Sequence, residues 1–372
     1  DPVAAVEMLR RLAYNGIGVK RLSSEVTLDG VSHPAGTWVI PMDQPNANFV
    51  RQLFAVQDYP DLREYPEGPP EQPYDVSGWT LPYLFGVRVI EARTPLDDAV
   101  RGAMEDLSSE PLGWLAEGDA QSWDSPPGVG FDSHPVARGI VPPAGAASGG
   151  GGSLILDPAQ NNSYKALAEA WRRGGSARFQ SGAAGSDGQG GSSGRWIVSG
   201  LGGGVQNELV ADYALRASRG GSAGTPVGQP RIGLYRPWSA SMDEGWSRWL
   251  MEMYGIAHTN LYNADVRAGD LKSRYDVIVL SDMRAGQIIN GSAPGTVPPR
   301  YAGGIGPEGL REIDAFVRAG GTLVTVNGSS QLAIDELHLP VSNVIQGVSR
   351  DEYFAGGAIV ELLVDPSHPV MS

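Results

Sequence analysis

Three continuous apolar runs, separated by helix-forming stretches, limit the fold of this chain more than any other feature. Runs and helical stretches alternate along the chain in the order 232–235, 242–254, 275–280, 307–318 and 322–326. Unbroken apolar runs are typical of strands buried on both faces, and strand–helix–strand alternation makes successive strands parallel. Residues 230–345 are therefore predicted to form a doubly wound α/β domain around a parallel sheet.

Residues 1–111 are predicted to form a separate α/β segment. Its expected elements are a helix at 3–15, β-prone runs at 26–30 and 36–41, a helix from Asn46 to Val56, and a β-prone stretch from Phe85 to Glu91. Asp29-Gly30 is a hairpin-turn dipeptide, so the first two β-prone runs are expected to pair.

Residues 112–217 are predicted to form a small α/β unit. Short apolar strands are expected at 113–116, 153–156, 177–179 and 196–198, with helices at 163–172 and 207–216. Gly/Ser-rich stretches at 144–153 and 181–194 are interpreted as loose insertions, and 218–229 as a linker. Residues 346–372 would begin a further segment. Both ends of the chain look cut, which suggests a piece of a longer protein.

Charge and hydropathy limit the classes of partner. The net charge of −14 opposes nonspecific binding to nucleic acid and to anionic membranes. No apolar stretch approaches the roughly 20 residues that a membrane-spanning helix needs. We therefore expect no nucleic-acid partner and no membrane span.

Cysteine is absent, and the histidines lack the spacing of a zinc site. None of the five histidines belongs to an HxxE or HExxH pair. Without cysteine there is no thiolate nucleophile and no thiolate ligand for a metal. The sequence therefore assigns no catalytic residue, no metal ligand and no cofactor site to this chain.

The loop after the first apolar run is the strongest candidate for a ligand or partner site. Ligands of open α/β sheets bind at the carboxyl ends of the strands, and this loop lies at such an end. It offers a cation, an aromatic ring and two carboxylates, from Arg236, Trp238, Asp243 and Glu244. The alternative, which we favour, is a helix cap from Ser241 to Glu244 with Trp246 and Trp249 in the core.

Polar residues also follow the second and third runs. Asp282 comes after the second run, and Asn327 and Ser329 come after the third. We add Asp282 and Asn327 to the candidate site. A sharp turn at Ser329 could present a nucleophile, but a serine nucleophile needs a histidine base, and no histidine has such a context. A structural turn is the favoured interpretation.

Two groups of motifs resemble a known family. They are AGTWVIPMDQP, QDYPD and PYDVSGWTLP within 35–82, and RIGLYRPWSASMDEGW, NADVRAGDL, YDVIVLSD, GGIGPEGL and FVRAGGTLV within 231–324. Together they resemble the region after the catalytic domain in large bacterial zinc carboxypeptidase-like proteins of the carboxypeptidase A type. The second group also resembles the class I glutamine amidotransferase-like fold, a flavodoxin-like sheet.

The resemblance implies a parent hydrolase active in proteolysis. In that family the zinc ligands are an HxxE pair and a later histidine, and no part of this chain matches them. Zinc is thus expected only in the missing N-terminal catalytic domain, which would be the first partner of this chain. An exported protein, periplasmic or extracellular, is expected.

Three functions follow as hypotheses. The leading one is a non-catalytic accessory region that serves docking, stabilisation or substrate capture. The first alternative is a glycan- or peptide-binding module that uses Trp238, Asp243 and Glu244, because aromatic faces beside acids suit such ligands. The second alternative is a serine-dependent hydrolase built on Ser329 or Ser241.

Overall fold

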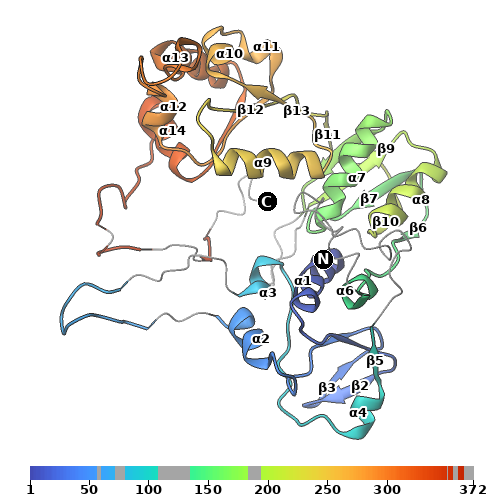
Figure 1. Cartoon of the computed structure of the whole chain (residues 1–372). Helices are drawn as coiled ribbons and strands as arrows, with labels where there is room; N and C mark the ends of the chain where they lie inside the picture. The colour runs from blue at the N-terminus through green and yellow to red at the C-terminus, as the bar shows by residue number, and fades with distance from the viewer. Residues whose placement is uncertain are drawn as a thin grey trace, which may run out of the picture. The chain divides into compact units, whose positions relative to one another are not determined.

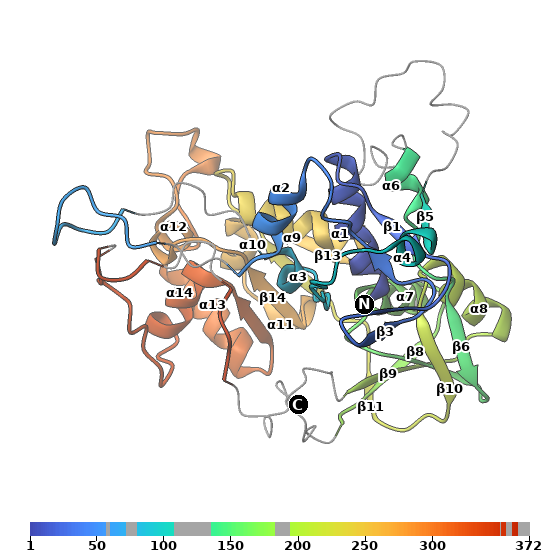
Figure 2. The same ribbon diagram turned by 90° about the horizontal axis from the view of Figure 1, so that it is seen from below.

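Helices and strands alternate through a mixed α/β protein, as expected from the sequence (Figures 1 and 2). The structure, a computed structural model, describes residues 1–56, 60–71, 80–107, 135–182, 194–349, 351–354 and 359–363. The chain divides into two compact units, one made mainly of Asp1–Gly145 and the other mainly of Asn162–Ser349. The domain bounds expected from the sequence stay predictions.

The first unit is built on α1 (Pro2–Tyr14), which confirms the predicted helix. The Asp1 carboxylate caps it by accepting from the Val3 amide at 3.0 Å. Its apolar face is buried against α6 (Pro135–Gly139), and Ile140 adds a fully buried side chain to the same core. The other helices of this unit are α2 (Ala47–Phe54), α3 (Leu81–Leu84) and α4 (Asp98–Gly102).

The predicted hairpin forms, but with a different second strand. β2 (Val26–Leu28) pairs with β3 (Val31–His33) across Asp29-Gly30, both of which have positive φ. This backbone suits a tight two-residue turn. The run at 36–41 instead supplies β4 (Trp38–Val39), which pairs with β1 (Lys20–Leu22).

The third strand of this small antiparallel sheet is β5 (Met104–Asp106), on the other side of β1. The strand expected from Phe85 to Glu91 does not form. Phe85 and Val87 pack on the core of the first unit, while Val89 and Ile90 are exposed and pair with no strand.

The second unit contains a six-stranded mixed sheet in the order β11-β8-β9-β7-β10-β6. Its strands are β6 (Ala146–Gly149), β7 (Ser153–Leu156), β8 (Ser176–Gln180), β9 (Arg195–Ser199), β10 (Arg216–Gly220) and β11 (Thr225–Val227). The helix α7 (Asn161–Arg172) confirms its prediction, while α8 (Gly203–Asp212) ends before Arg216, because Ala214 has a φ of 50°. The strand expected at 113–116 lies outside the described residues.

Two Gly-rich stretches contain strands that the insertion and linker interpretations did not predict. β6 lies within 144–153, and β10 and β11 include much of 218–229, so both interpretations were wrong there. Glycine is needed where two segments of the backbone approach each other closely. A Cβ at Gly151 would lie 2.6 Å from the Gly220 carbonyl oxygen, and one at Gly224 would lie 2.7 Å from that of Phe179. Most of the other stretch, 181–194, lies outside the described residues.

The second unit also contains the predicted parallel sheet, which has four strands. β12 (Ile232–Tyr235), β14 (Val277–Leu280) and β15 (Thr322–Thr325) confirm the three apolar runs. The edge strand β13 (His258–Leu261) was not predicted, because most of its residues are polar. All pairings are parallel, in the order β13-β12-β14-β15.

Helices cover both faces of this sheet. The predicted helices appear as α9 (Met242–Met253) and α13 (Gly306–Arg318), joined by α10 (Asn263–Arg267), α11 (Leu271–Arg274), α12 (Ala285–Asn290) and α14 (Ser330–Glu336). Figure 1 shows α9 on one side of the strands and α10, α11 and α13 on the other.

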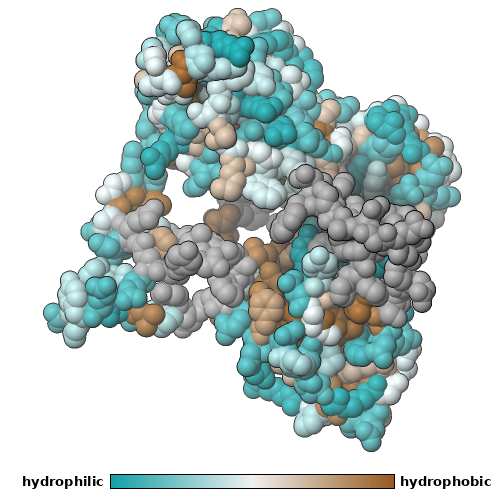
Figure 3. Space-filling model, viewed as in Figure 1, coloured by the Kyte–Doolittle hydropathy of each residue, from teal (hydrophilic) through white to brown (hydrophobic). Residues whose placement is uncertain are grey.

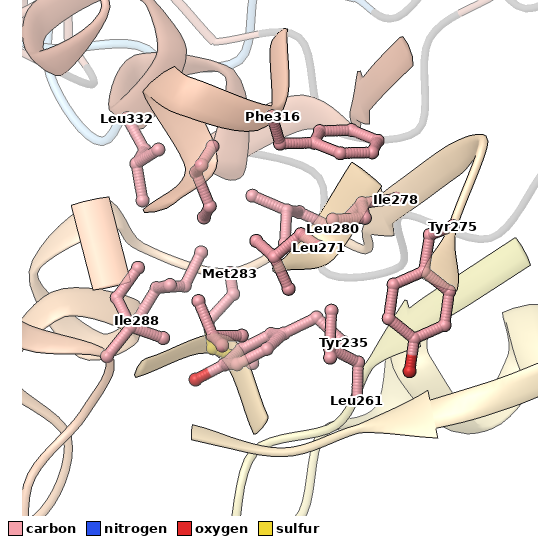
Figure 4. Packing of buried hydrophobic residues seen from close by; sticks show 13 residues of the cluster. Tyr235, Leu261, Leu271, Tyr275, Ile278, Leu280, Met283, Ile288, Phe316 and Leu332 are labelled. Atoms are coloured by element: carbon pink, nitrogen blue, oxygen red, sulfur yellow. The ribbon is translucent and has the colours of Figure 1, made fainter. Parts of the chain in front are cut away.

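The main core of this sheet lies on the α13 side. Figure 4 shows Phe316 of α13 and Leu332 of α14 packed with Ile278 and Leu280 of β14. The helix α9 adds no residue to this cluster. None of the helices in the described ranges combines the length and apolar character that a bilayer crossing requires.

Candidate functional site

The carboxyl ends of the four parallel strands carry the polar and aromatic residues of the candidate site. Parallel strands present their carboxyl ends at one edge of the sheet, where loops to the next helices gather. Arg236 follows β12, Tyr262 follows β13, Asp282 follows β14 and Asn327 follows β15. The loops form two separate clusters of contacts.

The first cluster is an aromatic one around Trp238, which is 45% exposed. The Trp238 ring stacks on Tyr262 with centroids 4.7 Å apart and an interplanar angle of 15°. The Tyr301 ring centroid lies 4.7 Å from that of the same indole, with an interplanar angle of 57°. The Arg300 guanidinium lies 4.4 Å from the Tyr301 ring centroid. Trp238, Tyr262 and Tyr301 together are called the aromatic cluster below.

Two linked hydrogen bonds, one buried and one half-buried, lie next to the aromatic cluster. The Tyr235 hydroxyl donates to Asn263 Oδ1 at 2.6 Å, and Asn263 Nδ2 donates to the Gly303 carbonyl oxygen at 3.0 Å. Burial raises the pKa of the Tyr235 hydroxyl above its ordinary value, so it stays protonated and remains a donor. These two hydrogen bonds fix the loop that carries Tyr301 against the end of β12.

A small hollow lies beside Trp238, lined by Tyr235, Asn263, Gln287, Ser292 and Tyr301 among others. Its volume of about 10 Å³ admits roughly one water molecule. A ligand at this place would therefore rest on the exposed aromatic surface and reach its polar rim, rather than enter an enclosed pocket.

The second cluster joins Asp282 to Asn327, as their positions after neighbouring strands suggest. The Asp282 carboxylate accepts from Asn327 Nδ2 at 2.7 Å and from the Gly328 amide at 2.9 Å. Asn327 has a φ of 49°, a left-handed conformation that asparagine tolerates. The pair thus closes the turn after β15, and both of its side chains have partners within it.

Ser329 is a structural residue in this turn. Its side chain is fully buried, its hydroxyl donates to the Leu280 carbonyl oxygen at 2.9 Å, and its oxygen accepts from the Val326 amide at 2.8 Å. Ser241 caps α9 by accepting from the Glu244 amide at 3.2 Å. Among the described residues, neither hydroxyl forms a hydrogen bond to the histidine that a serine nucleophile requires.

The remaining candidates of the loop after β12 do not gather around Trp238. The Arg236 amide donates to the Leu261 carbonyl oxygen, and Asp243 is exposed in the first turn of α9. The Glu244 carboxylate is buried and accepts from Arg248 Nε at 3.1 Å. Of the loop candidates, Trp238 is the one with a clear role in the surface of the site.

The predicted cap of α9 is confirmed at Ser241, but the two tryptophans are not in the core. Trp246 is 61% exposed and Trp249 is 37% exposed, and their rings meet edge to face at 5.8 Å. The helix turns Glu244 and Ser247 toward the sheet instead: the Ser281 hydroxyl donates to Ser247 Oγ at 2.9 Å.

Tyr262, Asn263 and Tyr301 were not among the site residues predicted from the sequence. Tyr262-Asn263 follows β13 directly, and residues after a parallel strand are site candidates, but this signal depends on recognising β13 first. The polar strand His258–Leu261 had no apolar run to reveal it. Tyr301 comes from a loop whose position depends on tertiary contacts.

Within the described part of the chain, no three His, Asp or Glu side chains lie close enough together to hold a metal ion. Comparison of the chain with protein-family models, with curated proteins and with solved structures finds no match.

Proposed function

We propose that this chain is a non-catalytic accessory region of a zinc carboxypeptidase-like protein and serves docking, stabilisation or substrate capture. Its first partner would be the zinc-bearing catalytic domain of the same protein, in an exported setting. We further propose that the four-stranded sheet is of the flavodoxin-like, class I glutamine amidotransferase-like type. The strand order second-first-third-fourth agrees with the beginning of that topology.

The observation that carries a non-catalytic role is the structural use of the reactive groups at the carboxyl edge. The Ser329 hydroxyl is buried between two backbone groups, Ser241 caps a helix, and Asp282 holds the turn at Asn327 and Gly328. A nucleophile must reach its substrate and a base at hydrogen-bond distance. These side chains support loops instead.

A fluorophosphonate probe tests the serine-hydrolase alternative. We expect no covalent labelling of the purified chain by intact-protein mass spectrometry, because the Ser329 side chain is buried and the Ser241 oxygen caps α9. A known serine hydrolase in the same reaction is the positive control. Labelling that disappears in a Ser329→Ala or Ser241→Ala variant would refute a non-catalytic role.

A glycan- or peptide-binding module is the second candidate function, and the aromatic cluster favours it. Trp238 presents an exposed indole that Tyr262 and Tyr301 hold in place, beside the polar side chains of Gln287 and Ser292. Rigid aromatic surfaces bury area at low cost in side-chain entropy. An open platform suits an extended polymer better than a small molecule, which prefers an enclosed pocket.

Replacing Trp238 with alanine is expected to weaken binding of an extended peptide or a neutral oligosaccharide about 30-fold or more, because a central aromatic contributes about 2 kcal/mol to an interface. Isothermal titration calorimetry with each probe measures the change. The melting temperature should stay close to that of the unaltered chain, and Tyr83→Ala, at an exposed aromatic residue outside both proposed sites, serves as the control. Equal binding by the two variants would contradict this role, and a collapse of the melt would make the loop structural.

A further inference from the structure

The helix α9 is turned so that its polar side faces its own sheet and its apolar side faces outward. Toward the sheet, Glu244 is buried with its carboxylate on Arg248, and Ser247 bonds to Ser281. The outward side chains are Met242, Trp246, Trp249, Leu250 and Met253, with exposed fractions of 75, 61, 37, 50 and 39%. These five residues are called the α9 face.

This orientation is the reverse of what the helix would adopt to cover its own sheet. A surface helix ordinarily buries its apolar stripe and exposes its polar one. In Figure 3, the surface at the position of α9 in Figure 1 is pale to tan beside teal surroundings. Contiguous exposed apolar residues of this kind mark interaction sites.

The spacing of the α9 face indicates what kind of partner fits. Four of these residues follow one another at steps of four, three and four positions, namely Met242, Trp246, Trp249 and Met253. This is the spacing of a and d positions in a heptad repeat. In that register Glu244 and Met251 take the opposite f positions, and Glu244 is indeed the buried residue of α9. A seam of this spacing packs against another helix at a shallow crossing angle.

The charges beside these a and d positions indicate the sign of the charge that a complementary partner carries. The flanking e and g positions hold Asp243, Gly245, Leu250 and Glu252, so both flanking charges are negative. Arg248 lies 3.6 Å from Glu252 but also binds the buried Glu244. A second copy of the chain would bring the same acidic flanks and a net charge of −14, which disfavours self-association. Basic flanks on the partner are complementary.

We propose that the α9 face is a docking site for an amphipathic helix of another protein, with apolar a and d residues and lysine or arginine at its flanks. Trp246 and Trp249 are the anchors, since tryptophan is enriched among the residues that dominate interface energy. The site lies apart from the aromatic cluster around Trp238. It does not depend on whether the chain is catalytic.

The test is binding of two synthetic three-heptad helices to the full chain, both with leucine at a and d, one with lysine and the other with glutamate at e and g. Fluorescence anisotropy of the labelled peptides should show saturable one-to-one binding of the lysine peptide and much weaker binding of the glutamate peptide. Trp246→Ala together with Trp249→Ala should weaken binding of the lysine peptide at least about 30-fold, although the net charge of the chain is unchanged. Asp243→Lys together with Glu252→Lys should reverse the preference.

Other results would overturn the proposal. Lysine-peptide binding that persists in the Trp246→Ala, Trp249→Ala variant would be nonspecific attraction to an acidic protein. A dimer in sedimentation velocity that is lost in this variant would assign the α9 face to a second copy. Protection of Met242 and Trp246 from hydroxyl-radical footprinting in the free chain would show that the chain covers the face itself. Binding to neutral phosphatidylcholine vesicles, with none to either peptide, would assign it to a lipid surface.

Discussion

Replacing Phe316 with alanine is expected to lower the free energy of unfolding of the four-stranded part by about 3–5 kcal/mol, the usual cost of removing a buried aromatic ring. Phe316 is 2% exposed and packs between α13 and β14 in the core shown in Figure 4. The surroundings cannot collapse readily, because the turn at Gly321 already touches the ring: a Cβ there would lie 2.3 Å from it.

Val317→Ala is the matched control for this substitution. Val317 is the next residue of the same helix and is exposed, so its truncation should change stability by about 0.5 kcal/mol or less. Urea unfolding followed by circular dichroism measures both, with separate fits if the two units unfold in separate transitions. Similar losses for Phe316→Ala and Val317→Ala would show that the core is not organised around this ring.

Gly291→Ala is expected to destabilise the same part by at least about 2 kcal/mol, through backbone strain and overpacking together. Gly291 has a φ of 57° and a ψ of −147°, a combination that is nearly restricted to glycine. A Cβ would also lie 2.1 Å from the Gly303 carbonyl oxygen. That oxygen accepts from Asn263, so the substitution should disturb the two linked hydrogen bonds next to the aromatic cluster as well.

Gly295→Ala separates the two contributions. Gly295 lies in the same loop and has a φ of 86°, but a Cβ there would meet nothing within 4 Å. Only the left-handed backbone penalty of about 1 kcal/mol applies. Thermal melts should therefore give a clearly lower melting temperature for Gly291→Ala than for Gly295→Ala. Equal melting temperatures would mean that the close approach to Gly303 is not maintained in solution.

The parallel sheet could be predicted from the sequence because its three central runs are continuous and apolar. Strands of this kind can be recognised from the sequence, whereas β13 could not, because His258, Thr259 and Asn260 are polar. Its place depends on pairing with β12, which is a tertiary contact. Edge strands are exposed on one side, so apolar patterning gives little information about them.

Glycine content misled the interpretation of 144–153 and 218–229. Gly-rich composition usually indicates flexible loops. At Gly151 and Gly224, however, the absent Cβ leaves room for another backbone segment: a Cβ would lie 2.6 Å from the Gly220 carbonyl oxygen and 2.7 Å from that of Phe179, respectively. Composition alone cannot distinguish a glycine that loosens a chain from one that lets two strands meet.

The candidate site was predicted in part. The rule that loops gather at the carboxyl ends of parallel strands correctly brought Asp282 and Asn327 together. It could not tell that Glu244 would turn inward to Arg248 while Trp246 and Trp249 turned outward. Helical periodicity gives the relative positions of side chains around α9, but the sequence does not say which side meets the sheet.

The most direct test of a non-catalytic accessory role is a zinc-dependent peptidase assay on the purified chain. A peptide with a free carboxyl terminus is incubated with the chain and excess zinc, and products are followed by mass spectrometry beside a zinc carboxypeptidase as positive control. We predict that the peptide remains intact at all times. Stepwise loss of its C-terminal residues, abolished by a chelator, would contradict the proposed function.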